Sequence, residues 1–170
     1  MIVQQVAFEY PELVRRIILL GTGPRGGEGM DFTELSVGEL DDQAKLLMFA
    51  FFTTSEASVA AGHAYIERLK LRTADRDGPV SKQAALAELA AIREWGATPS
   101  TNRFAMLKEI RHPTLVVHGI KDVVVNSINA FLLAQHIPNA QLIIYPDSSH
   151  GAQSQHATAF LAHVNIFLKD

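Results

Sequence analysis

Three short, largely apolar runs, separated by long helical stretches, place the strongest constraint on how this chain folds. They are Ile17–Leu20, Thr114–Val117 and Leu142–Tyr145, and each ends within two residues of a Gly or Pro. A short apolar run without polar alternation is typical of a strand buried on both faces, as in a parallel sheet. Strands that alternate with helices indicate right-handed crossovers. We therefore predict the α/β class, with about three parallel strands flanked by helices.

Helical patterns fill the segments between these runs, and residues 21–113 carry no strand pattern. Thr53 and Glu56 have the T-x-x-E spacing of a capping box, while Ser81 and Ser127 are expected to cap the helices that follow them. The predicted helices cover residues 1–10, 42–52, 53–71, 81–96, 103–109, 127–136 and 153–168. In the last of these, the apolar positions expected to face inward are Phe160, Leu161, Val164 and Leu168.

Charge and composition exclude several classes of function. The 170 residues carry a formal net charge of -3, and the basic residues are scattered, so we predict no nucleic-acid partner. The longest apolar run, residues 46–52, is far shorter than the roughly 20 residues of a membrane helix, so no membrane association is predicted. The chain has no Cys, which excludes disulfides and thiolate chemistry and fits the cytoplasmic location that we predict.

The loop after the first run spells a nucleotide-binding motif. Gly21–Gly26 reads G-x-G-x-x-G after a predicted strand, which is the pattern of a dinucleotide site. However, Pro24 lies inside the turn, and no amphipathic helix begins at the third glycine to receive a pyrophosphate. We therefore favour a flexible exit from the strand over nucleotide binding, and we predict no cofactor.

The loops after the second and third runs place a carboxylate and an imidazole together. Asp122 follows the second run and His150 follows the third. Each residue alone is more often a turn or loop residue, but neighbouring parallel strands present their carboxyl-end loops side by side. Asp122 could then orient one ring nitrogen of His150, leaving the other nitrogen as a general base.

The remaining histidines show no metal-ligand spacing, so we predict no metal site. His118 ends an apolar run, and we expect it to be a hydrogen-bonded core histidine. Most of the others are expected to be solvated; they are His63, His112, His136, His156 and His163.

Three segments resemble the α/β-hydrolase family, in its lid-containing esterase, lactonase and haloperoxidase-like branch. Met1–Gly21 resembles the helix and strand after the nucleophile elbow, Pro113–Asp122 the strand that ends in the triad acid, and Tyr145–Gly151 the loop with the triad histidine. The resemblance covers nearly the whole chain but only the C-terminal portion of a family member, with strands equivalent to strands 6–8. It implies that residues 1–29 and 111–170 form a partial core, with residues 30–110 as a helical lid.

The same resemblance implies Asp122 as the triad acid and His150 as the base of an enzyme that hydrolyses an ester-like bond in a small molecule. The G-x-S-x-G elbow with its serine and oxyanion donors should precede Met1 and does not occur in the chain. Smaller departures are Ser149 where glycine is usual before the histidine, and Asn126 where proline is common. We therefore expect Met1 to be an internal methionine of a longer hydrolase, and this chain to be inactive alone.

A second hypothesis treats the chain as a non-catalytic interaction protein. Without the strands that precede it in the family, the strand at residues 16–20 would be an unpaired edge beside exposed apolar surface. Such an edge favours a homodimer, docking on a partner, or aggregation.

Overall fold

The computed structural model describes residues 1–30, 43–75, 78, 80–97, 99 and 101–169. Its sheet contains three parallel strands in the order β1 (Ile17–Leu20), β2 (Thr114–Gly119) and β3 (Ala140–Tyr145). Ile17 lies opposite Thr114, which in turn lies opposite Ala140. The predicted α/β class with a partial α/β-hydrolase sheet is confirmed.

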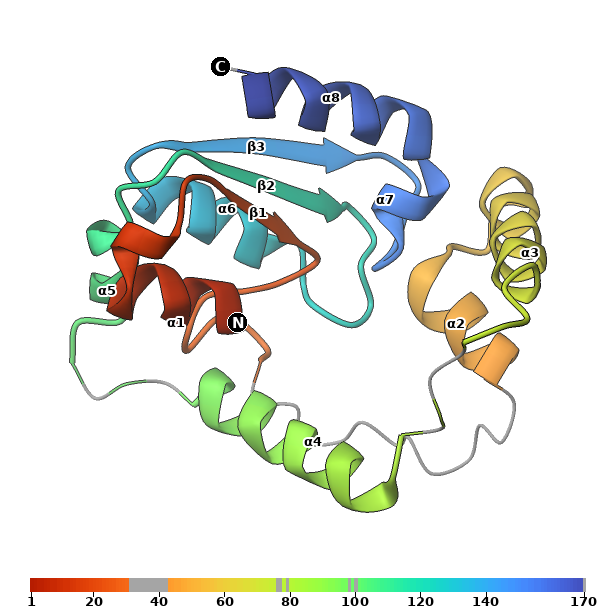
Figure 1. Cartoon of the computed structure of the whole chain (residues 1–170), viewed down its shortest axis with the longest axis horizontal. Coiled ribbons are helices and arrows are strands. Elements are labelled where there is room, and N and C mark those ends of the chain that lie inside the picture. The colour runs from red at the N-terminus through yellow and green to blue at the C-terminus, as the bar shows by residue number, and fades with distance from the viewer. Residues whose placement is uncertain (31–42, 76–77, 79, 98, 100, 170) are drawn as a thin grey trace.

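Helices cover both faces of this sheet (Figure 1). On one face lie α1 (Ile2–Glu9), α5 (Ala105–Glu109) and α6 (Ile128–His136), with the short 3-10 helix η1 (Pro11–Leu13) after α1. On the other face lies α8 (Ala157–Lys169). The strands carry their side chains alternately to the two faces, so each face has its own apolar core.

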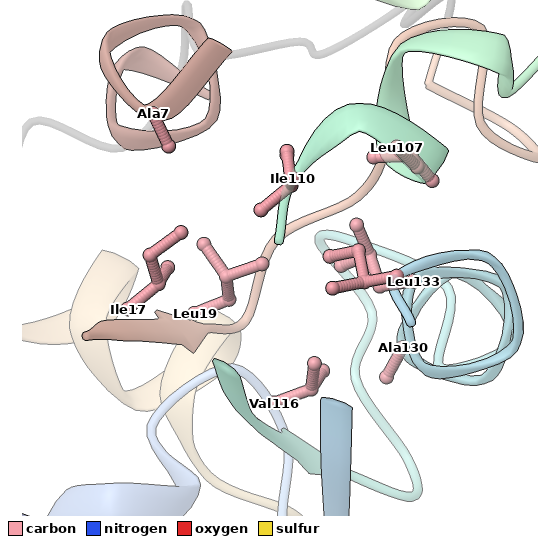
Figure 2. Packing of buried hydrophobic residues seen from close by; sticks show 9 residues of the cluster. Ala7, Ile17, Leu19, Leu107, Ile110, Val116, Ala130 and Leu133 are labelled. Atoms are coloured by element: carbon pink, nitrogen blue, oxygen red, sulfur yellow. The ribbon is translucent and has the colours of Figure 1, made fainter. Parts of the chain in front are cut away.

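Each core draws on β2. The first, part of which Figure 2 shows, consists of Ala7, Ile17, Leu19, Leu107, Ile110, Val116, Ala130, Leu133 and Ile137. The second consists of Leu115, Val117, Tyr145, Ala152 and Phe167. β2 is buried at all six positions because it lies between the other strands.

Burial on both faces was predicted for all three runs, and this is wrong for the outer two. In β1, Leu20 is 37% exposed, and in β3 only Tyr145 is fully buried. Both strands lie at edges of the described sheet, where each has one strand neighbour and incomplete helix cover.

Four further helices lie beyond the strand ends or below the sheet in Figure 1. α2 (Gln43–Phe51) packs against α3 (Glu56–Lys70), and α3 packs against α7 (Ala152–Gln155). α4 (Lys82–Gly96) runs apart from them. None of the described helices combines the length and apolarity needed to cross a bilayer.

The predicted capping box at Thr53 is wrong. Ser55 is the N-cap of α3, and its side-chain oxygen accepts a hydrogen bond from the backbone N–H of Ser58 at 3.2 Å. The Thr53 hydroxyl instead donates to a carboxylate oxygen of Asp147 at 2.9 Å. Thr53 thus bonds to Asp147, a residue distant in sequence, rather than to the helix end that its spacing predicts.

The cap predicted at Ser81 is confirmed, whereas Ser127 holds the predicted N-cap position without a capping side-chain bond. Ser81 accepts from the backbone N–H of Ala84 at 3.1 Å. Ser127 makes no side-chain cap bond; the side-chain oxygen of Asn126 accepts from Ile128 N–H at 3.1 Å. Asn126 therefore satisfies the helix end one residue earlier than predicted.

The final predicted helix is interrupted at His156, between α7 and α8. Phe160 and Val164 face inward as predicted, and they pack with the buried Phe167. The predicted inward positions Leu161 and Leu168 are wrong, because they are 56% and 39% exposed. The stripe at 160, 164 and 167 follows the 4-then-3 spacing of one helix face, and Leu161 and Leu168 fall beside it.

Candidate active site

Asp122 and His150 lie together at the carboxyl ends of β2 and β3. The Nδ1 atom of His150 is 2.9 Å from Oδ2 of Asp122. The Asp122 side chain is fully buried and that of His150 is 26% exposed. This contact uses Nδ1, so Nε2 is the ring nitrogen left to exchange a proton with a reacting group.

The other oxygen of Asp122 is fixed by the backbone. Oδ1 accepts the N–H groups of Val124 at 2.8 Å and Val125 at 2.9 Å, so the chain turns tightly around its own carboxylate. Burial would raise the pKa of Asp122, but hydrogen bonds from His118 and His150, the charge of His150 and the Val125 N–H together hold it well below the ordinary value of 3.8. Asp122 is therefore ionised at neutral pH.

His118 belongs to this site, and sequence reasoning assigned it only to the core. Its Nε2 lies 3.0 Å from Oδ2 of Asp122 and 2.8 Å from the backbone oxygen of Val125. Its Nδ1 is buried without a hydrogen-bond partner among the described residues. The expectation of a fully hydrogen-bonded core histidine is therefore wrong for one of its two nitrogens. The H-x-x-x-D spacing was the available signal.

The last turn of α2 docks on the loop that carries His150. The backbone oxygen of Ala50 accepts from His150 N–H at 3.2 Å and from the Ser149 hydroxyl at 2.7 Å. The backbone oxygen of Phe51 accepts from Gly151 N–H at 3.0 Å, and its ring meets the His150 ring edge-on with centroids 5.7 Å apart. The donors of the His150 loop thus pair with backbone oxygens at the C-terminus of α2, which a helix end leaves without partners.

Two glycines permit this close approach. Gly21 has a positive φ of 50°, and a Cβ there would lie 2.9 Å from Cε1 of His150. At Gly119, a Cβ would lie 2.2 Å from the backbone oxygen of Ser149. The first glycine of the G-x-G-x-x-G pattern therefore makes room for an imidazole. No helix begins in residues 21–30, where nucleotide binding would need one.

Asp147 anchors the same loop to the start of α3. Its carboxylate accepts from the hydroxyls of Ser55 and Thr53 and lies 3.2 Å from Nζ of Lys121. The hydrogen bonds from Ser55 and Thr53, with Lys121, lower the pKa of Asp147 against a smaller opposing effect of burial. Gln155 also donates to the Asp147 backbone oxygen at 2.7 Å. These contacts hold the His150 loop rather than perform chemistry.

The serines beside His150 are committed to other partners. Ser148 donates to the backbone oxygen of Tyr145 at 3.1 Å, and Ser149 donates to that of Ala50. In the part of the chain that the structure describes, no group of three or more acidic or histidine side chains is placed to hold a metal ion. Asp122 can orient His150, and His150 can deprotonate a nucleophile. The nucleophile itself must come from another group.

A cavity of about 690 Å³ lies between α1 and α4. Its lining includes Met1, Ile2, Ile92 and Trp95, with Arg25 at its margin. Asp122 and His150 are not among its lining residues. This cavity and the Asp–His pair are therefore distinct features of the described chain.

Parallel strands bring an acid and a histidine to the same sheet end, which is where α/β proteins place their functional groups. A family model described as TAP-like protein, of the α/β-hydrolase group, matches residues 79–170. The chain belongs to the α/β-hydrolase family and corresponds to a C-terminal portion of that fold.

Curated relatives extend the match along the chain. A 2-hydroxymuconate semialdehyde hydrolase from Pseudomonas putida is 25% identical over 97% of this chain and 57% of its own length. A 2-hydroxy-6-oxo-6-phenylhexa-2,4-dienoate hydrolase from Burkholderia cepacia is 27% identical over 91% of this chain and 54% of its own. The chain thus spans little more than half the length of these relatives.

Solved structures agree on the fold. An α/β hydrolase fold protein from Chitinophaga pinensis superposes with a TM-score of 0.90 and 34% identity, over 99% of this chain and 61% of that one. A meta-cleavage product hydrolase from Pseudomonas fluorescens IP01 gives a TM-score of 0.70 at 20% identity, over 98% and 60%. At that lower identity the likeness shows the fold alone.

Proposed function

We propose that this chain carries the acid and the base of a Ser-His-Asp hydrolase triad, with Asp122 as acid and His150 as base. The observation that carries the proposal is the 2.9 Å contact between Asp122 Oδ2 and His150 Nδ1 at the ends of neighbouring strands. Asp122 would fix the tautomer of His150 and stabilise its imidazolium form. The nucleophilic serine would be the third member, and no G-x-S-x-G elbow occurs in these 170 residues.

The proton transfers follow from this geometry. Nε2 of His150 takes the serine proton as the serine oxygen bonds to a substrate carbonyl carbon, and then gives that proton to the leaving group as its bond breaks. Water then attacks the acyl-serine while His150 Nε2 takes a proton from it. His150 returns that proton to the serine oxygen as the acid product leaves. Because the chain lacks the elbow, we propose that it is inactive by itself.

The proposed substrate is a small molecule attacked at a carbonyl carbon. An ester-like bond is the simplest case for a triad of this kind. The relatives are named for a semialdehyde and for 6-oxo-dienoates, which also present a carbonyl group. An ester and a 6-oxo-dienoate are therefore the two probes that separate these substrate classes.

We propose that residues 30–110 form a lid over a partial core made by residues 1–29 and 111–170. The described part of this segment contacts the core at several places, among them the following two. Ala50 and Phe51 receive hydrogen bonds from the His150 loop. At the other end of the segment, Trp95 Nε1 donates to the backbone oxygen of Gly23 at 3.2 Å.

A 4-nitrophenyl ester assay of the chain beginning at Met1 tests the proposed inactivity. We expect the rate of the chain to equal that of its His150→Ala variant. Turnover that His150→Ala abolishes would contradict the inactivity. In-frame translation of the DNA upstream of Met1 tests the missing nucleophile, and a stop codon without an elbow would count against the triad.

If the upstream frame encodes G-x-S-x-G, the longer product tests the two roles directly. His150→Ala and Asp122→Asn should each reduce kcat on the ester by several orders of magnitude, on the order of 10⁴-fold for the Asp change. Full activity of either variant would remove that residue from the triad. The 6-oxo-dienoate, assayed beside the ester, identifies the preferred substrate class.

A second candidate function, a non-catalytic interaction protein, rests on exposed apolar surface beside β1. Ile2 is 81% exposed, Phe8 43% and Leu13 74%, and β1 is an edge strand of the described sheet. We propose a homodimer or a docked partner on this surface as the alternative. A tight dimer by native mass measurement, together with no esterase activity in the longer product, would favour it over the hydrolase.

A further inference from the structure

The Asp122 carboxylate is shared by two imidazoles, and the proposed triad accounts for only one of them. His150 approaches Oδ2 through Nδ1 at 2.9 Å, and His118 approaches the same oxygen through Nε2 at 3.0 Å. The His118 side chain is fully buried, whereas that of His150 is 26% exposed. His118 therefore acts on the acid from the protein interior.

The surroundings of His118 fix its protonation state. Nε2 makes a hydrogen bond with the backbone oxygen of Val125 at 2.8 Å and also lies 3.0 Å from Asp122 Oδ2, so this nitrogen carries a hydrogen. Nδ1 is buried and has no hydrogen-bond partner among the described residues. A proton on Nδ1 would bury an unpaired donor together with a positive charge, which is costly. His118 is thus held as the neutral tautomer with its hydrogen on Nε2.

A neutral donor on Oδ2 has two effects on the acid. It stabilises the ionised carboxylate, and it uses part of the acceptor capacity that would otherwise attract the proton of His150. The titratable groups that contact Asp122 are His118 and His150. Lys121 is next in sequence but pairs with Asp147, on the outer side of the loop. His118 and His150 therefore compete for one oxygen.

We propose that His118 is a positioning residue, which donates an Nε2–H hydrogen bond to Asp122 Oδ2, holds the carboxylate toward His150 and limits the basicity of His150. The meaning of this role for catalysis rests on the proposed function, in which His150 is the base. The contact itself does not depend on the proposed function, because it involves only the side chains of His118, Asp122 and His150.

A merely structural role predicts something different. If His118 served only to hold Val125 through its backbone oxygen, its removal would change stability and leave the proton affinity of His150 alone. If it donates to Asp122, its removal strengthens the attraction between Asp122 and a protonated His150. The pKa of His150 must then rise.

NMR titration of the whole chain, with ¹⁵N-labelled histidine, measures both quantities. In the wild type we expect the ¹⁵N shifts of His118 to place its hydrogen on Nε2. His118→Phe removes the donor and should raise the measured pKa of His150 by roughly 0.5 to 1, since a net hydrogen bond of about 1 kcal/mol corresponds to that change. His118→Gln offers an amide N–H near the same position and should restore most of the wild-type pKa.

His136→Gln is the matched control, because His136 packs against Phe104 rather than against Asp122. It should leave the pKa of His150 unchanged. The proposal is overturned if His118→Phe leaves that pKa unchanged, or if His118→Gln raises it as much as His118→Phe does. If His118→Phe does not fold, a wild-type His118 with its hydrogen on Nδ1 overturns it equally.

Asp122→Asn separates this inference from the proposed function. Removing the carboxylate charge should lower the pKa of His150, whatever His118 does. If Asp122→Asn leaves that pKa unchanged, the Asp122–His150 pair fails and the proposed triad fails with it. If Asp122→Asn lowers it and His118→Phe has no effect, only the role of His118 is rejected.

Discussion

At Asp122, burial and hydrogen bonding act on one carboxylate in opposite directions, and hydrogen bonding prevails. The pKa in the folded chain lies well below the ordinary value of 3.8, so the stabilisation is complete above 3.8 and is lost progressively as the pH falls from 3.8 toward the lower folded pKa. Asp122→Asn should therefore destabilise the chain by about 1.5–3 kcal/mol at pH 7, as expected for a buried charged hydrogen-bond acceptor. The difference should shrink at pH 3.

Urea unfolding of the wild type and Asp122→Asn at the two pH values measures this difference. Asn has nearly the same volume, so the comparison measures the loss of the charge together with the loss of one acceptor oxygen. A difference that is equal at pH 7 and pH 3 would mean that the Asp122 carboxylate is not held ionised by its neighbours.

Ser149 provides a second test at the residue scale. Its buried hydroxyl donates to Ala50 oxygen at 2.7 Å and accepts from Val123 N–H at 3.3 Å, so it joins the His150 loop to α2 and to the Asp122 turn. Ser149→Ala removes both bonds and should speed hydrogen exchange at the His150 and Gly151 amides, which also bond to the end of α2.

Ser148→Ala is the matched control, because Ser148 is equally buried but its hydroxyl donates to the nearby backbone oxygen of Tyr145 rather than to α2. It should leave exchange at those two amides nearly unchanged. If both variants speed exchange to the same extent, the Ser149 hydroxyl has no special part in holding α2.

The residues of the candidate site differ in how far the sequence could predict them. Asp122 and His150 follow from a general rule, since loops after neighbouring parallel strands meet at one edge. The contact of His118 does not, because the chain must first turn around the Asp122 carboxylate through the Val124 and Val125 amides. Spacing alone does not reveal that turn.

At the scale of elements, two serine caps allow a direct comparison. Ser55 and Ser81 each accept a backbone N–H at the start of a helix, but the Ser55 hydroxyl also donates to Asp147. Ser81→Ala should cost about 1 kcal/mol, the ordinary value of an N-cap. Ser55→Ala should cost more, because it also loosens α3 from the His150 loop.

Urea unfolding of the two variants beside the wild type measures both costs. Equal costs would show that the Ser55–Asp147 contact adds nothing to the cap. A second readout is the amide of Asp147, whose chemical shift should move in Ser55→Ala and stay in place in Ser81→Ala.

Sequence patterns predicted where most elements lie because local spacing sets helical and strand periods. They missed the break at His156, which depends on a tertiary contact. The ring of His156 stacks on Tyr145 at 4.9 Å, and its Nε2 lies 3.1 Å from the backbone oxygen of Pro146. Both partners come from the end of β3, and no local pattern in residues 153–168 encodes them.

At the scale of the whole molecule, the three apolar runs predicted the parallel sheet. They did not predict how far the outer strands are covered by neighbouring elements. Leu20 is 37% exposed because β1 has one strand neighbour in the described sheet. The elements that precede β1, α1 and η1, also carry exposed apolar side chains, which are Ile2, Phe8 and Leu13. Exposed apolar side chains beside a strand edge favour association.

We therefore expect the chain to associate with rising concentration, and Leu13→Lys to weaken that association. Leu13 lines a groove with Val3, Val6 and Leu168, and Arg15 and Arg16 also line it. A lysine at position 13 therefore replaces an apolar contact and adds a further positive charge to this groove. Sedimentation velocity over a hundredfold range of concentration measures the effect. The expected result is a lower sedimentation coefficient for Leu13→Lys than for the wild type at the same high concentration.

Leu71→Lys is the matched control for general solubility. Leu71 is 79% exposed, close to the 74% of Leu13, but it lies at the end of α3 rather than beside β1. Both variants add one positive charge, so any effect of net charge is common to them. If Leu71→Lys weakens association as much as Leu13→Lys, the cause is charge rather than contact at the β1 edge. If the wild type stays monomeric throughout, the edge is not an association surface.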